Sequence, residues 1–496
     1  MLQTLKNAWR TKEIRSKIIF TFIILLLYRI GTVVPVPYVD ANNFAASFQG
    51  TILEYMDILS GGELGAATLF ALGVSPYINA SIVLQLLGVV FPNSIGALAK
   101  NDKKKMGFIT RIVTVVLAII TAVGYYFLLA RAGMLTPEAT KGVGNMAWFY
   151  GIVIITCYVA GASLIMWLAD RINERGIGNG ISIILFANII STLPSQMYNL
   201  GKLVVATFSY TNPHKIWYII GTIAFALVFI AILVASVIFV VFMTGSERRI
   251  PIQYAKKNVG RKMYGGQNTH LPIKLNMTGV MPVIFASSIV SLVPTIFALC
   301  GVTSETENFW GKCAKVLGSD GFVYPLVFFI LIIAFAYFYT QITFNPIEVA
   351  NNLKMNGGAI PGIRQGRPTS DHIRKILNKI TLAGALFLSI IAVVPIIAGP
   401  HLIEPLLEKI LMGGVADPNY LDTAWLEANI LDPVELEQYK SAALDAIANY
   451  KSQAAALSGV FTFGGTSLII VVGVALETFR DLEAQLTMRN YKGFLG

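Results

Sequence analysis

Long apolar runs separated by polar connections dominate the pattern of this chain. An apolar helix needs about 20 residues to cross the hydrocarbon core of a bilayer. The pattern predicts ten membrane-spanning helices, at residues 18–34, 76–90, 108–129, 148–168, 181–193, 216–243, 277–298, 322–343, 380–397 and 464–479. We expect the fifth helix to be short, because Pro194 follows it directly.

The region around the second span, residues 56–92, is nearly apolar, but its first half makes a poor span. That half holds residues that weaken a helix or are costly in hydrocarbon: Asp57, Ser60, Gly61, Gly62, Glu63 and Gly65. A new helix is expected to start at Ser75 and Pro76, with the serine as N-cap. We expect a short, glycine-loosened helix and then a true span, because irregular backbone at membrane depth must be covered by protein or line a water-filled cavity. Such a break indicates a channel or transporter, although a kinked helix without a functional break explains it as well.

The ten spans divide into two sets of five, which would insert into the membrane in opposite orientations. Inverted halves that meet at the bilayer midplane recur in proteins that move substances across membranes. The predicted fold class is an all-α polytopic membrane protein, in which two inverted five-helix halves, residues 1–200 and 201–496, surround a central pore.

Composition agrees with a membrane protein. The chain is 55% hydrophobic and 13% charged, whereas soluble domains carry about 25% charged residues. The net charge of +11 does not indicate nucleic-acid binding, because most of the basic residues lie in alternate connections and most of the acids in the others. This positive-inside pattern predicts that both termini are cytoplasmic.

No cleavable signal peptide is expected. Cys300 and Cys313 fall in one external loop, where they either pair or remain free thiols.

Two long basic connections are predicted on the cytoplasmic side, at residues 244–275 and 344–379. In the first, Ile250, Ile252 and Tyr254 alternate with polar residues, which predicts a hairpin. Pro251 and Pro272 are expected to confine its strands to sheet edges. The second connection contains a glycine-rich and proline-containing turn, residues 357–364, that would present one arginine.

The external connection at residues 400–458 is long and acidic. Its second part favours a helix, with Asp432 as N-cap and Pro433 at the first helical position. We expect one or two external helices over the mouth of the pore. For residues 413–422 a disordered acidic loop is an equally good interpretation.

Six motifs in order resemble the SecY family of bacterial Sec translocon channels. They are FALGVSPYINASIVLQLL (70–87), ERGIGNGISIILFANII (174–190), ERRIPIQYAKK (247–257), NMTGVMPVIFASS (276–288), FNPIEVANNLKMNGGAIPGIRQG (344–366) and FGGTSLIIVVGVALET (463–478). Two features depart from the family: the connection at 400–458 is longer than usual, and Gln365 stands where proline is common. The resemblance implies a channel that translocates unfolded secretory polypeptides and releases hydrophobic segments into the bilayer through a lateral gate.

The resemblance also implies an apolar pore ring formed by Ile78, Ile82, Leu185, Ile189, Ile284, Ile469 and Ile470. A narrow aliphatic constriction dewets and offers no hydrogen bonds, so it leaks little and does not bind the passing chain. The pairs Ile78–Ile82 and Leu185–Ile189 each share one helical face, as i, i+4 spacing requires. Ordinary packing is the alternative role for these residues.

By the same resemblance, a plug covers the external side of the ring at about residues 57–73, with Gly61, Gly62, Leu64, Gly65 and Leu69. A lateral gate would include Asn79, Gln85, Ser287 and Ser288. Polar groups in a membrane bundle can hydrogen-bond between helices, each bond contributing about 0.6 kcal/mol and at most about 2. Static packing is the alternative interpretation of these polar residues.

The resemblance assigns the two basic connections to docking of the SecA motor ATPase and of ribosomal RNA, whose phosphates attract basic side chains. The candidate residues are Arg248, Arg249, Lys256, Lys257 and Arg364, of which Arg364 should be the most sensitive. The other partners implied are the SecE and SecG subunits, signal peptides and nascent chains, and membrane lipids, at the bacterial plasma membrane.

No motif for catalysis, metal binding or nucleotide binding is present in the sequence, so we expect neither an enzyme nor a cofactor. The main alternative function is an ion-coupled secondary transporter of small solutes, a class that also uses inverted halves and broken helices. That function would need ionisable groups near mid-membrane, and the predicted span interiors hold almost none. A membrane scaffold or insertase without a pore is a third class, but it would not need an apolar ring.

Overall fold

The computed structural model describes residues 2–40, 61–91, 93, 95–96, 102–136, 147–208, 215–254, 257–259, 262–264, 268–300, 309, 311, 323–412 and 465–487. In the first half of the chain the helices are α1 (Leu2–Arg10), α2 (Lys12–Gly31), α4 (Ser75–Val90), α6 (Lys103–Arg131), α8 (Ala147–Arg175) and α9 (Gly180–Phe208). In the second half they are α10 (Lys215–Gly245), α11 (Met281–Cys300), α13 (Val323–Thr343), α14 (Pro346–Met355), α15 (Arg367–Ala398), the π-helical turn η2 (Gly399–Ile403), α16 (Glu404–Met412) and a last helix at 465–487.

Every predicted span overlaps one of these helices. Within the described part of the chain, six helices are long and apolar enough to cross a membrane, and Ser75–Val90 and Met281–Leu292 form shorter apolar helices. The two remaining predicted spans, 18–34 and 464–479, overlap α2 and the helix at 465–487. Of the external connection, η2 and α16 are described; the predicted helix after Asp432 lies outside the described residues, as does Cys313.

The prediction that the fifth span ends at Pro194 is wrong, because α9 continues through this proline to Phe208. Proline is tolerated within membrane helices when nearby groups satisfy the backbone that it frees. The flanking serine hydroxyls bond to other carbonyls of the same helix and not to the Ile190 carbonyl that the proline frees: Ser191 donates to Asn188 at 2.6 Å, and Ser195 donates to Thr192 at 2.7 Å.

Segment 61–74 forms a series of turns and not the short helix that was expected. Gly61 and Gly62 adopt φ of 83° and 85°, and Ala67 adopts 45°, values that a right-handed helix does not contain. The segment instead pairs with the chain that follows α2. The Leu69 amide donates to the Val34 carbonyl at 2.9 Å, and Thr68 forms an isolated bridge with Pro35.

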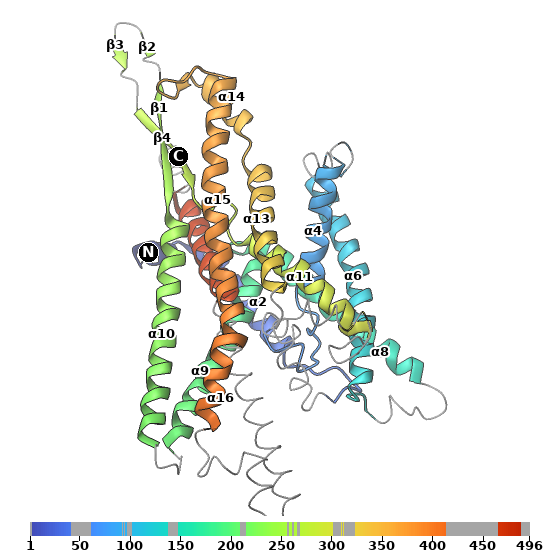
Figure 1. Ribbon diagram of the computed structural model, residues 1–496. Coiled ribbons are helices and arrows are strands. Elements are labelled where there is room, and N and C mark those ends of the chain that lie inside the picture. The colour runs from blue at the N-terminus through green and yellow to red at the C-terminus, as the bar shows by residue number, and fades with distance from the viewer. Residues whose placement is uncertain are drawn as a thin grey trace, which may run out of the picture.

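The predicted hairpin is present and projects from one end of the molecule, here named the hairpin end (Figure 1). Strand β1 (Glu247–Tyr254) pairs antiparallel with β4 (Asn268–Lys274), and β2 (Lys257–Val259) pairs with β3 (Lys262–Tyr264) beyond them. Strand β5 (Gly358–Ala359) pairs with the other side of β1, giving the order β4-β1-β5.

Pro251 therefore lies in the central strand and not at an edge, which corrects the prediction. This position is possible because β5 is short and pairs only with Gln253 and Tyr254 of β1. On the β5 side of β1, Pro251 therefore has no paired residue that would need an N–H donor. The sheet packs against α14 and α15 through a cluster formed by Ile250, Ile252, Ile273, Leu353, Ile360, Ile373, Leu377 and Ile380.

Helices α10, α13 and α15 run along one part of the molecule, and α4, α6 and α8 form the other, with α2 and α11 between them (Figure 1). Helix α11 contacts α4 and α6 on one side and α13 and α15 on the other. At the turn between α8 and α9, the two halves are joined by the Gly178 amide, which donates to Asp481 at 3.1 Å. Lys17 also donates to Gln485 at 3.0 Å.

We expect Gly180→Ala to destabilise the protein by about 1–3 kcal/mol, because a Cβ at this position would stand 2.1 Å from the Ala169 carbonyl oxygen. Gly201→Ala on the same helix is the matched control, since its Cβ would meet nothing within 4 Å. Thermal unfolding in detergent compares the two. Equal melting temperatures would contradict the close α8–α9 approach.

Candidate functional site

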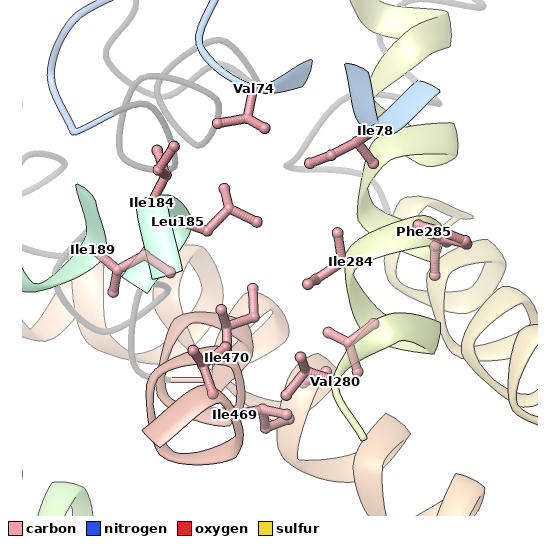
Figure 2. Packing of buried hydrophobic residues seen from close by; sticks show 14 of the residues in the cluster. Val74, Ile78, Ile184, Leu185, Ile189, Val280, Ile284, Phe285, Ile469 and Ile470 are labelled. Carbon is pink, nitrogen blue, oxygen red and sulfur yellow. The ribbon is translucent and has the colours of Figure 1, made fainter. Parts of the chain in front are cut away.

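The seven predicted ring residues meet in one buried cluster. Ile78 and Ile82 come from α4, Leu185 and Ile189 from α9, Ile284 from α11, and Ile469 and Ile470 from the helix at 465–487. None is more than 6% exposed. Figure 2 shows Ile78, Leu185, Ile284 and Ile470 pointing toward a common centre from four different elements. Both halves of the chain thus contribute to this apolar centre.

Further apolar residues extend the cluster, namely Val74, Ile184, Val280 and Phe285 (Figure 2). Gly473 allows the helix at 465–487 to approach α11 closely, because a Cβ there would stand 2.1 Å from Val280. Aliphatic side chains offer neither donors nor acceptors to a peptide backbone. A constriction built from them excludes water and does not bind a polypeptide chain.

Segment 61–74 lies between this cluster and a second one. Phe70 and Val74 belong to the first cluster, and Leu69 is half-buried against it. Leu64, Ala67 and Ala71 belong to the second, which α6 and α8 complete with Ala122, Tyr125, Leu129, Ile154 and Tyr158. Of the predicted plug residues, Leu64 and Gly65 are buried, whereas Gly61, Gly62 and Leu69 are half-buried.

Three tyrosine hydroxyls donate hydrogen bonds to this segment. Tyr28 donates to the Glu63 carboxylate at 2.7 Å, Tyr125 to the Leu64 carbonyl, and Tyr158 to the Ala67 carbonyl at 3.4 Å. Sequence reasoning treated Glu63 only as a costly group and did not single out the tyrosines. A signal was available, because a buried carboxylate requires a donor.

The predicted gate residues differ in what they contact. Ser287 and Ser288 both donate to the Ile284 carbonyl of their own helix, at 2.8 and 2.9 Å, so neither bridges two helices. The Gln85 amide donates to Ser81 at 2.9 Å, and its oxygen accepts from the Tyr339 hydroxyl of α13. The Asn79 oxygen is buried with no hydrogen-bond partner among the described residues. The bond between α4 and α13 was not foreseen, because Tyr339 is one of several tyrosines in an apolar span.

At the hairpin end, Arg248, Arg249 and Arg364 are exposed. Arg249 forms an ion pair with Glu247 at 2.7 Å. Burial lowers the pKa of Lys274, helped by the nearby Arg480 and opposed by Glu247. Lys256 and the side chain of Lys257 lie outside the described part of the chain.

The turn that carries Arg364 is shaped by its neighbours. Gly362 and Gly366 adopt φ of 81° and 96°, which favour glycine. Gln365, at the position where proline is common in the family, donates to the Gly358 carbonyl at 3.1 Å. The Arg364 carbonyl accepts from Thr369 at 2.8 Å, which fixes the backbone and leaves the guanidinium free to extend outward.

Solved structures with this fold are protein-conducting channels. One such channel structure covers 84% of this chain and 95% of its own, at 18% identity and a TM-score of 0.53. A second, of a SecY protein whose plug domain stabilises the closed state, covers 77% of this chain and 85% of its own, at 19% identity and 0.53. A third, Sec61 in a canine ribosome–channel complex, covers 84% and 95%, at 17% identity and 0.50. This chain therefore has the fold that these channel structures share.

Sequence comparison identifies the family. The SecY family model matches residues 68–416. The chain is 38% identical to a protein translocase subunit SecY from Streptomyces galbus and 36% identical to one from Mycobacterium tuberculosis, with 100% of each chain covered in both cases. This chain belongs to the SecY family, and it is a protein-conducting channel. The solute transporter considered from sequence finds no support in these relatives.

We expect Tyr339→Phe to weaken the contact between α4 and α13, because it removes the donor to Gln85. An interhelical bond of about 0.6–1.7 kcal/mol corresponds to about 3- to 18-fold faster amide exchange along α4. Tyr337→Phe is the control, since Tyr337 bonds to Asn378 on the exposed side of α13. Equal exchange in the two variants would contradict a role for this bond.

Proposed function

We propose that the apolar cluster of seven residues is the constriction through which unfolded secretory polypeptides pass. The observation that carries this proposal is the convergence of Ile78, Leu185, Ile284 and Ile470 from four helices, two in each half of the chain. An aliphatic ring of this kind closes around an extended chain without binding it and dewets when the chain leaves. Segment 61–74, packed against the ring through Phe70 and Val74, serves as the plug of the idle channel.

The two halves, residues 1–200 and 201–496, part along a seam between α4 on one side and α11 and α13 on the other. This seam is the lateral gate through which signal peptides and hydrophobic segments reach the lipid. Gln85 and Tyr339 hold it by one interhelical hydrogen bond, and Asn79 lies in the same helix. A single bond of this strength keeps the seam closed in the idle channel and still permits it to open.

The hairpin end faces the cytoplasm together with both termini, as the distribution of basic residues favours. Arg248, Arg249 and Arg364 lie exposed there and bind the SecA motor and the ribosome. The ribosome-bound Sec61 neighbour supports the ribosome as a partner of this fold. The chain itself catalyses no reaction, so the motor or the ribosome supplies the energy.

The exposed apolar surface of α10 supports the proposal that the chain contacts membrane lipids and the SecE and SecG subunits. Helix α10 exposes many of its apolar side chains, including Leu227, Val234 and Phe242. Such a surface fits the hydrocarbon of the bacterial plasma membrane and the single-span helices of SecE and SecG.

Replacing Ile82 and Ile189 by Asn is expected to raise the ion conductance of the idle channel several-fold, because amide groups keep the constriction wet. The measurement is single-channel current in planar bilayers. Ile82→Leu, which keeps the apolar volume, is the control and should leave the idle current unchanged. An idle current in the Asn double variant that equals that of the unmodified channel would contradict the role of these residues as the constriction.

Reversing the charge at Arg364 with Arg364→Glu should reduce SecA-driven export of a preprotein at least tenfold, while the folded channel still purifies, because an exposed contact to an acidic partner becomes repulsive. Lys354→Glu on α14 is the matched control, since Lys354 is also exposed at the hairpin end. Export is measured in proteoliposomes. Normal export with Arg364→Glu would exclude this docking contact.

A further inference from the structure

Segment 61–74 is held by side chains that come from three separate helices. Tyr28 lies on α2, Tyr125 on α6 and Tyr158 on α8, and each hydroxyl donates to a different residue of the segment, Glu63, Leu64 and Ala67 respectively. All three tyrosines are buried, with at most 4% of their surface exposed. We name this set the tyrosine clasp.

The same helices fit the backbone of the segment closely. A Cβ at Gly161 of α8 would stand 1.9 Å from the Leu69 carbonyl oxygen, and a Cβ at Gly31 of α2 would stand 2.1 Å from the Phe70 ring. Tyr28 also stacks on Phe70, with ring centroids 5.3 Å apart. The segment is therefore seated directly on α2 and α8.

The segment needs this support because its own conformation is unfavourable. Ala67 adopts φ of 45°, a left-handed value that alanine rarely takes, and it is buried. Glu63 is only 2% exposed, so its carboxylate depends on donors such as the Tyr28 hydroxyl. Without the clasp, segment 61–74 would lose the contacts that offset these two costs.

All three clasp helices belong to residues 1–200, and the second apolar cluster, with Leu64, Ala67 and Ala71, is also formed from residues of this half. The halves meet where α11 contacts α4 and α6 and where Tyr339 of α13 donates to Gln85 of α4, and none of these contacts includes a donor or an acceptor of the clasp. Parting of the halves along that seam therefore leaves the clasp intact.

We propose that the tyrosine clasp fixes the plug to the N-terminal half, so that plug release is a step separate from opening of the lateral gate. The strength of the clasp then sets how readily the channel admits a weak signal sequence. This inference rests on the proposed role of segment 61–74 as the plug.

The test follows the segment itself. Thr68 is 5% exposed, and Thr68→Cys is close to isosteric, so its reaction with a water-soluble maleimide reports release of the segment. The background carries Cys157, Cys300 and Cys313 replaced by Ala or Ser. We expect Tyr28→Phe and Tyr158→Phe each to raise the labelling rate several-fold, and the double variant to raise it further. Glu63→Gln, which keeps an acceptor and loses the charge, should give a smaller rise than Tyr28→Phe.

Tyr126→Phe, next to Tyr125 on α6, is the matched control, because the Tyr126 hydroxyl lies at Gly151 of α8, 3.1 Å from where a Cβ of that residue would stand. Labelling that is no faster in the clasp variants than in Tyr126→Phe would overturn the inference. Faster labelling together with increased export of preproteins with weakened signal sequences would support it.

Two further outcomes separate this inference from the proposed function. If labelling accelerates while the idle current stays at its low value, the clasp holds the segment, but the segment is not the seal. If the Asn variants of the ring raise the idle current while the clasp variants are labelled at the rate of Tyr126→Phe, the proposed constriction is supported and the role of the tyrosine clasp is excluded.

Discussion

Backbone groups in a membrane protein must find their hydrogen-bond partners inside the protein, and this constraint governs the centre of the molecule. Segment 61–74 breaks the regular helix, so its amides and carbonyls need partners other than a helical ladder. It finds them in Val34, in its own turns and in the hydroxyls of Tyr125 and Tyr158, while Tyr28 donates to the Glu63 carboxylate. The arrangement of α2, α6 and α8 around the segment follows from this need.

The apolar cluster and the hydrogen-bonded segment 61–74 differ in how they treat polar groups. In the proposed function, the seven aliphatic side chains of the apolar cluster present nothing that a passing peptide can hydrogen-bond. Around the segment, donors and acceptors are matched individually, since each unpaired polar group in the bilayer core would be costly. The channel thus combines a surface that does not bind its substrate with a neighbouring element that the protein itself binds closely.

The hairpin end differs from the membrane-spanning part, because it holds exposed arginines on a packed support. The sheet of β4, β1 and β5 is fixed to α14 and α15 by a cluster of isoleucines and leucines. Thr369 donates to the Arg364 carbonyl and Gln365 donates to the Gly358 carbonyl, so that the exposed Arg364 side chain projects from a defined turn. Rigid presentation lowers the entropy that is lost when a partner binds.

The sequence by itself determined the local features of this protein. Apolar runs of membrane length predicted the positions of the spans, and alternating isoleucines predicted the hairpin, because both patterns follow from the period of one element. The i, i+4 pairs on α4 and α9 also indicated which face of each helix meets its neighbours.

Only the tertiary structure decided how distant residues are paired. Pro251 sits in a central strand and segment 61–74 forms turns, because in both cases groups outside the local stretch satisfy or spare the backbone. Pro194 also does not end α9, which continues through it to Phe208. The contacts of Tyr28 with Glu63 and of Tyr339 with Gln85 join residues 35 and 254 positions apart. No local period encodes such pairs; they arise when helix packing brings two polar groups together in a medium that offers them no other partner.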